Sequence, residues 1–270
     1  MVLTSSICHN VIESVTICPN LKQPVTIFTI CPNLSQFIPM LNNLSQPKPT
    51  FPNIKAIIFD LDQTLLDSFE TVVKAHSLSA KENYNLTIDE NIIREKWGLP
   101  LEQFWQEIYE RKDIHENLHK NVVAIRHKYN IVASLFKDVL ELLTELKKNY
   151  MLAILTSTST ELTIFHIGQT PLPLDYFEFI QGSDQTEFHK PDPRVFDLTK
   201  DKLRKYKIKP EEMLYVGDST HDYLSSKGAG INFVGVLTGL NSKEDFLELG
   251  LDESLLMTNL TQLKHYLPQH

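Results

Sequence analysis

The chain has few cysteines, and none lies beyond the first fifty residues. The three are Cys8, Cys18 and Cys31, so the rest of the chain can form neither a disulfide framework nor a thiolate metal site. This distribution is typical of proteins of the reducing cytoplasm, where disulfides are rare. We therefore expect a cytoplasmic location.

Long apolar runs and an excess of basic residues are also absent. No uninterrupted apolar stretch reaches the roughly eighteen residues that a membrane-spanning helix needs, so we expect no membrane span. With 26 Lys and Arg against 34 Asp and Glu, the formal net charge is −8. Affinity for nucleic acid depends on clustered cations, so we expect no nucleic-acid partner. A small anionic substrate stays compatible with a few locally placed cations.

Residues 1–50 differ from the rest in composition, because they hold only three charged side chains. They also repeat a tetrapeptide, as Ile-Cys-His-Asn at 7–10 and Ile-Cys-Pro-Asn at 17–20 and 30–33. Polar residues and prolines interrupt every apolar stretch, so we expect no signal peptide. The composition predicts a poorly ordered N-terminal extension, with Met40 as a possible true start. An adhesive interaction segment is the alternative.

A short apolar run over 54–59 ends abruptly in carboxylates. Its hydrophobic residues are nearly continuous, as in a strand that is buried on both faces of a parallel sheet. Side chains two residues apart point the same way in a strand, so Asp60 and Asp62 are expected to face one site. Two carboxylates about 4 Å apart repel by roughly 4 kcal/mol at an effective dielectric of about 20. The pair indicates a divalent metal or a shared proton; an acidic turn after the strand is the alternative.

Residues 68–130 have helical patterning. Thr87 and Glu90 are predicted to form a capping box, and apolar residues recur at helical spacing. The pattern predicts a small helical insertion after the first strand. Trp97 is expected to pack inside it, and the break at 98–100 is a candidate for substrate contact. The predicted helices are 88–96, 101–109 and 118–129.

After a helix predicted over 132–149, apolar strands alternate with amphipathic helices. Such alternation is typical of a parallel α/β sheet with right-handed crossovers. The predicted strands are 152–155, 177–180, 213–216, 232–236 and a short edge strand at 255–257, and the predicted helices include 193–206 and 260–267.

Polar residues stand where the predicted strands stop, on the same rim of the sheet as Asp60. Each alone has an ordinary explanation as a helix cap, a surface cation or a turn residue. Their chemically complementary types at one rim favour an active site. The residues are Thr156, Ser157, Lys190, Asp218 and Asp222.

These residues resemble the four motifs of the haloacid dehalogenase superfamily, in particular its phosphoglycolate-phosphatase-like hydrolases. The matches are Asp60-Leu61-Asp62-Gln63-Thr64, Thr156, Lys190-Pro191, and Gly217-Asp218 with Asp222. The resemblance covers about 52–267. It implies a Rossmann-like α/β core formed by 51–67 and 131–270, with a helical cap at 68–130. Gln63 stands where many relatives have glycine, which affects the flexibility of the loop but removes no reacting group.

The resemblance also implies a reaction, the Mg²⁺-dependent hydrolysis of a small phosphomonoester through an aspartyl-phosphate. Asp60 would attack phosphorus, and Asp62 would act as general acid and then as general base. Asp60, the main-chain carbonyl of Asp62 and Asp218 would hold Mg²⁺, a hard ion that prefers oxygen ligands.

The remaining motif residues are implied to handle the phosphate group. Thr156, Ser157 and Lys190 would bind its oxygens. Asp222 would orient Lys190 or a metal-bound water. The implied partner is a small phosphorylated metabolite, and the chain is expected to be a monomer or a homodimer.

Other activities of the superfamily stay open as alternatives. Dehalogenases and phosphonate hydrolases lack the acid at position 62, whereas phosphomutases keep it but typically have Gly-Val or Gly-Ile in place of Gln63-Thr64. A phosphatase is therefore favoured over a mutase. A catalytically silent binding scaffold is disfavoured because the reacting groups are intact. Phosphoglycolate, a nucleotide monophosphate, a sugar phosphate and pyrophosphate all remain possible substrates.

Overall fold

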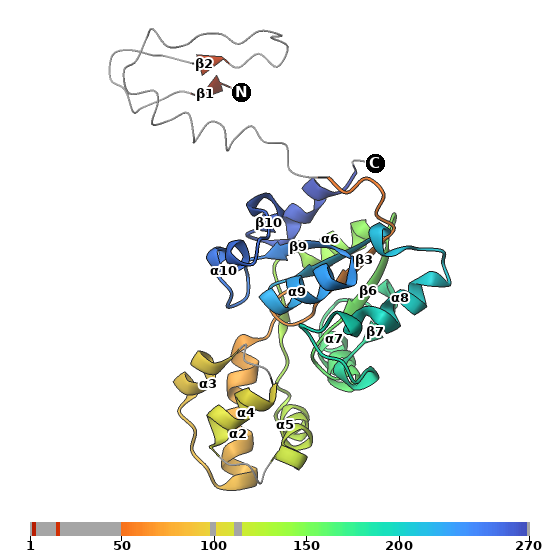
Figure 1. Cartoon of the computed structure of the whole chain (residues 1–270). Coiled ribbons are helices and arrows are strands. Elements are labelled where there is room, and N and C mark those ends of the chain that lie inside the picture. The colour runs from red at the N-terminus through yellow and green to blue at the C-terminus, as the bar shows by residue number, and fades with distance from the viewer. Residues whose placement is uncertain (1, 4–14, 17–49, 98–100, 111–114, 269–270) are drawn as a thin grey trace, which may run out of the picture. The chain divides into compact units, whose positions relative to one another are not determined.

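The computed structural model describes residues 2–3, 15–16, 50–97, 101–110 and 115–268 (Figure 1). The chain divides into two compact units, Met1–Pro47 and Lys48–His270. In the first, β1 (Val2–Leu3) pairs antiparallel with β2 (Val15–Thr16). The expectations for Met40, for the cysteines and for the break at 98–100 lie outside the described residues.

The second unit is built on a parallel sheet of six strands, in the order β10-β9-β8-β3-β6-β7. This sheet confirms the predicted α/β fold, including the short edge strand. The central strand β3 lies between β8 and β6, so the carboxyl ends of these three strands are neighbours. The strands are β3 (Ala56–Phe59), β6 (Met151–Leu155), β7 (Phe177–Gln181), β8 (Met213–Gly217), β9 (Asn232–Val236) and β10 (Leu256–Met257).

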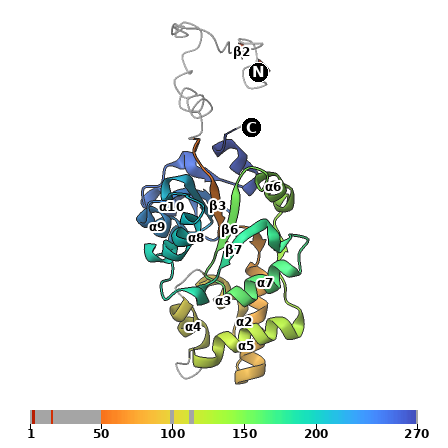
Figure 2. The same cartoon turned by 90° about the vertical axis from the view of Figure 1, so that its right-hand side faces the viewer.

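Helices cover both faces of the sheet (Figure 2). Ile57 and Phe59 of β3 face a core shared with α6, whereas Ile58 faces a second core shared with α8, α9 and α10. Every residue of β3 is buried, which explains its continuous apolar sequence. One layer contains α6 (Val139–Leu146) and α7 (Thr160–Gly168), and the other α8 (Asp197–Arg204), α9 (Thr220–Ala229) and α10 (Lys243–Glu248).

A helical insertion follows the first strand of the sheet, as predicted. It has a hydrophobic core of its own, which includes Val72, Ile93 and Leu118. Trp97 packs edge-on against Phe69 and Phe104, with ring centroids 6.2 and 5.8 Å apart. In Figure 1 the four helices lie together, apart from the helices that flank the sheet. They are α2 (Phe69–Tyr84), α3 (Glu90–Lys96), α4 (Leu101–Tyr109) and α5 (His115–Tyr129).

The segments that connect the insertion to the sheet pair with each other. β4 (Leu66–Asp67) and β5 (Ser134–Leu135) form a two-stranded antiparallel ladder. The predicted helix over 132–149 is therefore wrong at its start, because its first residues are extended in this ladder. Asp138, with φ at 65°, precedes α6. No helix among the described residues is long and apolar enough to cross a bilayer.

Three further local predictions need correction. The helix predicted over 88–96 starts at Glu90, and its N-cap is Asp89, whose carboxylate accepts from the Asn91 N–H at 2.9 Å. The Thr87–Glu90 capping box is thus wrong, because a second good N-cap residue stands two positions on. The helix predicted over 193–206 is a 3-10 turn, Pro193–Phe196, followed by α8. The last predicted helix, 260–267, is a 3-10 segment, Leu260–Tyr266.

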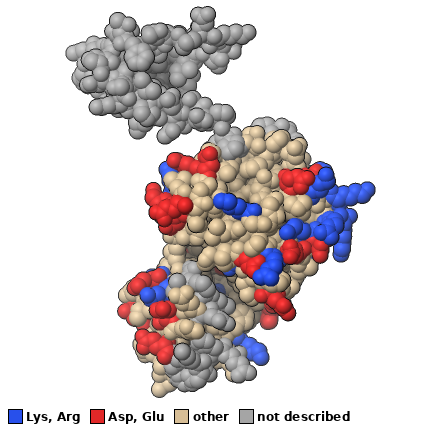
Figure 3. Space-filling model, viewed as in Figure 1, with Lys and Arg blue, Asp and Glu red and all other residues tan. Residues whose placement is uncertain are grey.

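Charged side chains of both signs are distributed over the surface. On the face shown in Figure 3, Lys and Arg gather mainly over α8. Two of these cations pair with acids of the same helix, Lys200 with Asp197 at 3.1 Å and Arg204 with Asp201 at 2.9 Å. Such exposed pairs contribute only about 0–1 kcal/mol each, so α8 presents a solvated face of mixed charge.

Candidate active site

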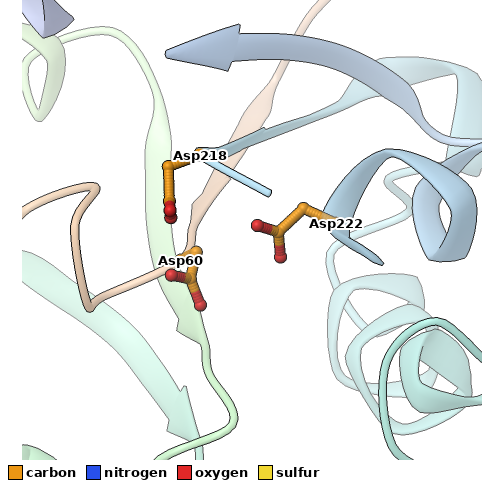
Figure 4. A group of neighbouring side chains, drawn as sticks. All are labelled: Asp60, Asp218 and Asp222. Carbon is orange, nitrogen blue, oxygen red and sulfur yellow. The ribbon is translucent and has the colours of Figure 1, made fainter. Parts of the chain in front are cut away.

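The carboxyl ends of β3 and β8 bring together three acids that are far apart in the sequence. Asp60 directly follows β3, Asp218 directly follows β8, and Asp222 lies in the first turn of α9. One carboxylate oxygen from each lies within 4.8 Å of the others. Figure 4 shows the carboxylates of Asp218 and Asp222 turned toward Asp60. The chain thus forms a compact acidic group at the sheet edge that sequence analysis selected.

Lys190 crosses this acidic group from the loop after β7. Its Nζ donates to Asp60 Oδ1 at 2.7 Å, to Asp222 Oδ1 at 2.6 Å and to the Tyr215 hydroxyl at 3.0 Å. Only 6 % of the side chain is exposed. An ammonium group has three donors, so these partners fix its position completely.

Asp222 holds Lys190 and also starts a helix. Its Oδ2 accepts from the Ser219 hydroxyl at 2.6 Å and the Ser219 N–H at 3.0 Å, while Ser219 Oγ accepts from the Asp222 N–H. This reciprocal capping box is typical of Ser at the N-cap with an acid three residues later. Tyr215 donates to Asp222 Oδ1 at 2.9 Å. Ser219 is therefore the N-cap of α9, and the same cap positions the carboxylate of Asp222 in the site.

Asp218 is held between two loops. The Thr64 hydroxyl donates to its Oδ1 at 3.0 Å. On the other side, a Cβ added to Gly239 would lie 1.9 Å from Asp218 Oδ2. Only glycine leaves room for the carboxylate in this position.

The electrostatics of this group are unbalanced. Burial raises the pKa of Asp60 to about 7, against the opposing charge of Lys190. Burial and the charge of Asp60 raise the pKa of Asp218 well above its usual range. Burial acts in the same direction on Asp222, but the charge and hydrogen bond of Lys190 lower its pKa overall. The raised pKa values mean that Asp60 and Asp218 resist ionisation in this surrounding. With all three carboxylates ionised, the group would carry two negative charges beyond the one that Lys190 balances, and a divalent cation with oxygen ligands would offset them.

Asp62 turns its carboxylate to a different partner. The Thr158 hydroxyl donates to Asp62 Oδ2 at 2.6 Å. The third member of the acidic group is Asp222, not Asp62. Sequence reasoning placed the two carboxylates of the first motif in one small volume and gave Asp222 only a supporting role.

The two residues after β6 have different surroundings. Thr156 is buried, and its Oγ1 accepts from the Thr158 N–H at 3.1 Å. Ser157 is exposed at the same loop. Thr158 and Tyr215 were not predicted as site residues, and Thr64 was named in the first motif without a role. Their signals are weak: Tyr215 stands in an apolar strand, and the two threonines bond partners about a hundred residues away or more.

Gln63 adopts a backbone conformation that usually favours glycine, with φ at 57°. The donors and acceptors around the Gln63 side chain place its amide oxygen toward the start of α2. There it accepts from the N–H groups of Ser68 at 3.0 Å and Phe69 at 2.8 Å, while its amide nitrogen donates to Thr238 O at 3.0 Å. Glutamine thus satisfies main-chain donors at the start of α2 that glycine would leave unpaired.

Comparison with known proteins agrees with this arrangement of residues. Residues 57–236, which include all four motifs, match the family model described as haloacid dehalogenase-like hydrolase. The chain belongs to this family. The resemblance stated from the motifs is thereby confirmed, and this haloacid dehalogenase-like protein is a hydrolase.

Relatives of this hydrolase carry several activities in their names. It is 30 % identical over 189 residues to pyrophosphatase PpaX of Oceanobacillus iheyensis, covering 70 % of this chain and 86 % of that one. It is 28 % identical over 208 residues to a phosphoglycolate phosphatase of Colwellia psychrerythraea, covering 73 % and 90 %. A solved Thermotoga maritima structure assigned to a β-phosphoglucomutase is similar with a TM-score of 0.61 and 28 % identity, covering 78 % and 99 %.

Proposed function

We propose that this hydrolase is a Mg²⁺-dependent phosphatase that cleaves a small phosphorylated metabolite through an aspartyl-phosphate on Asp60. The observation that carries the proposal is the buried group of Asp60, Asp218 and Asp222 in which Lys190 bonds Asp60 and Asp222. When all three carboxylates are ionised, this group carries two negative charges that Lys190 does not balance. A nucleophilic carboxylate can attack a phosphate dianion only where cations offset the charge of both. The charge deficit at Asp60 is of the size that one divalent ion supplies.

Three oxygen donors are proposed to hold the metal: a carboxylate oxygen of Asp60, the main-chain carbonyl of Asp62, and Asp218. Asp222 lies in the same acidic group, but its oxygens already accept four hydrogen bonds, from Lys190, Tyr215 and Ser219. Asp222 is therefore assigned to Lys190. When bound, Mg²⁺ would neutralise charge between the nucleophile and the phosphoryl oxygens.

The two motif carboxylates are proposed to divide the chemistry. An oxygen of Asp60 attacks phosphorus in line, and the bond to the leaving oxygen breaks. Asp62 gives its proton to that oxygen, and afterwards takes one from the water that hydrolyses the acyl phosphate. Thr158 positions Asp62 through its hydrogen bond.

The phosphoryl oxygens need donors of their own. Thr156, Ser157 and Lys190 are proposed to supply them from the loops after β6 and β7. Lys190 would exchange one of its three present partners, Asp60, Asp222 or Tyr215, for a phosphoryl oxygen. The Thr158 N–H donates to Thr156 Oγ1 and holds the loop in place. Because Thr156 Oγ1 only accepts in this bond, its own hydrogen is free to point at a ligand. Ser157 is exposed in the same loop and is placed to contribute a further donor.

A phosphomutase is the second candidate, because it uses the same two carboxylates and because a structure assigned to a β-phosphoglucomutase shares this fold at 28 % identity. The pair Gln63-Thr64 argues against it, since mutases of the superfamily typically have Gly-Val or Gly-Ile there. The two activities differ in product. Incubation with β-glucose 1-phosphate yields free phosphate from a phosphatase and glucose 6-phosphate from a mutase.

A panel of phosphorylated compounds tests the proposal. Wild type and Asp60→Asn are assayed for phosphate release from phosphoglycolate, a nucleotide monophosphate, sugar phosphates and pyrophosphate, with Mg²⁺ and with a chelator. We expect release that requires both Mg²⁺ and Asp60. Release that persists in Asp60→Asn refutes the assigned nucleophile, and a wild type inactive on the whole panel favours the silent scaffold.

A further inference from the structure

The hydroxyl of Tyr215 joins three of the elements that form the site. Tyr215 lies in β8, the strand that Asp218 follows, and its side chain is fully buried. The hydroxyl accepts from Lys190 Nζ at 3.0 Å, because an ammonium group can only donate. Its own hydrogen faces two acceptors, Asp222 Oδ1 at 2.9 Å and the main-chain oxygen of Leu155 at 3.0 Å. One oxygen atom thus contacts the loop after β7, the first turn of α9 and the end of β6.

The ring of Tyr215 is held in place by aromatic neighbours. Phe196 packs edge-on against it with ring centroids 4.9 Å apart, and Phe233 lies tilted at 6.3 Å. Burial and the charges of Asp222 and Asp60 raise the pKa of Tyr215 well above its usual value, so the hydroxyl keeps its hydrogen. Close packing of this kind leaves the ring little freedom to rotate. The hydroxyl is therefore a fixed group that donates on one side and accepts on the other.

Lys190 needs partners that stay in place during the proposed reaction. Asp60 loses its negative charge when its oxygen bonds phosphorus. The donor that Lys190 gives to Asp60 at 2.7 Å then has a better acceptor in a phosphoryl oxygen, which stays charged. Asp222 and Tyr215 are the two other partners, and the reaction consumes neither of them. They can hold Nζ while its third donor turns from Asp60 to the phosphoryl group.

The same hydroxyl reaches the other loop that is proposed to bind phosphate. Leu155 is the last residue of β6, and Thr156 follows it directly. The contact between Tyr215 and the Leu155 carbonyl therefore sets the position of Lys190 relative to Thr156. A displacement of about 1 Å at a reacting centre can cost about 10²-fold in rate. A fixed group between the two loops is thus of direct value to catalysis.

We propose that Tyr215 is a positioning residue for the hydrolysis: its hydroxyl anchors Lys190 beside the end of β6, so that Lys190 and Thr156 bind oxygens of one phosphoryl group. This inference rests on the proposed phosphatase function. Tyr215 itself touches no substrate and acts through Lys190. Its hydroxyl should matter for turnover, although the site keeps every charged group without it.

Tyr215→Phe tests the inference, because it removes the hydroxyl and keeps the ring. Tyr266→Phe is the matched control: Tyr266 is also fully buried, and its hydroxyl donates to a main-chain oxygen, Leu256 O at 3.1 Å, at the edge of the sheet. We would measure kcat and KM for p-nitrophenyl phosphate with Mg²⁺. Tyr215→Phe should lower kcat about tenfold or more and leave KM within about threefold, because Lys190 keeps its charge but loses its alignment. Tyr266→Phe should leave both constants within about twofold of the wild type.

A double-mutant cycle shows whether Tyr215 acts through Lys190. The dissociation constant of orthovanadate with Mg²⁺, measured by calorimetry, needs no turnover, and vanadate adopts the five-coordinate geometry of a phosphoryl group in transfer. Tyr215→Phe should weaken vanadate binding about tenfold in the wild-type background and less than about twofold in Lys190→Gln. Equal weakening in both backgrounds contradicts an effect through Lys190.

A crystal structure of the wild type with Mg²⁺ and orthovanadate supplies a test that needs no variant, should Tyr215→Phe not fold. Lys190 Nζ should lie at about 3 Å from the Tyr215 hydroxyl, from Asp222 and from a vanadate oxygen, and should have left Asp60. A Lys190 that has left Tyr215 overturns the inference.

The kinetic outcomes separate this inference from the proposed function. An unchanged kcat in Tyr215→Phe, or an equal loss in Tyr266→Phe, gives the hydroxyl a structural role and overturns the inference alone. A wild type that hydrolyses no phosphorylated compound refutes the proposed function, and the inference with it.

Discussion

Acidification is expected to destabilise this protein through His76. The side chain is 6 % exposed, lies edge-on to Phe104, and its Nδ1 is hydrogen-bonded to the Tyr109 hydroxyl at 3.1 Å. Burial, aided by the charges of Arg126 and His119, lowers the pKa of His76 from 6.5 to about 3. At about pH 5 the folded protein therefore keeps a neutral imidazole, whereas the unfolded chain protonates it.

The magnitude follows from proton linkage. Stability falls on acidification wherever the unfolded state binds more protons. Between pH 6.5 and the folded pKa of about 3, His76 contributes a slope of about 1.4 kcal/mol per pH unit, so about 2 kcal/mol is lost by about pH 5. For a domain of this size, that corresponds to a Tm lower by about 4–8 °C.

Urea unfolding at about pH 7.5 and about pH 5 measures the effect. The other titrating groups act on wild type and His76→Gln alike, so the difference in free energy of unfolding between the two isolates His76. That difference should shrink by about 2 kcal/mol at the lower pH, because the variant has no imidazole to protonate. His265→Gln, at an exposed position, should track the wild type. Parallel pH profiles for wild type and His76→Gln would refute the reasoning.

Three other predictions concern the site. Asp60→Asn should form no phosphoenzyme in rapid-quench labelling, whereas Asp62→Asn should still form some from aryl phosphates. The hydrolysis rate of Asp62→Asn on alkyl esters should be lower by about 10²–10⁴-fold, and a rate independent of leaving-group pKa contradicts this division of roles. Gly239→Ala should displace the Asp218 carboxylate, whose Oδ2 would lie 1.9 Å from the new Cβ, and weaken Mg²⁺ activation; an unchanged Mg²⁺ titration argues against Asp218 as a ligand. Tyr215→Phe, which leaves Asp222 and Lys190 one hydrogen bond short, should lower the free energy of unfolding in urea by about 1–2 kcal/mol; no change means that the hydroxyl is dispensable.

The centre of the sheet was predictable because its strands are buried on both faces. β3 and β8 have continuous apolar sequences, and every residue in them is buried. The start of α6 was not predictable in this way, since Ser134 and Leu135 become extended only by pairing with β4. Secondary-structure propensity depends on neighbouring residues, so it does not predict pairing with a strand some seventy residues away.

The site residues also differ in how far the sequence predicts them. Asp60, Lys190, Asp218 and Asp222 follow strand ends, so topology alone brings them to one rim. Thr158 gave no comparable signal, because its role depends on where Asp62 turns its side chain. Asp222 joins Asp60 and Asp218 in the acidic group because the cap of α9 holds its carboxylate there, and the sequence does not show this geometry. The boundaries 1–50 and 68–130 for the extension and the cap stay predictions.

The hydrogen bonds of Gln63 have a consequence for motion. Its amide oxygen holds the first two N–H groups at the start of α2, and its main-chain carbonyl accepts from the Thr238 hydroxyl. The residue also lies in the loop that carries Asp60 and Asp62. A rotation of the helical insertion about the β4–β5 ladder must therefore either carry this loop along or break two hydrogen bonds to a buried amide. The side chain of Gln63 thus links the helical insertion to the loop that carries the nucleophile.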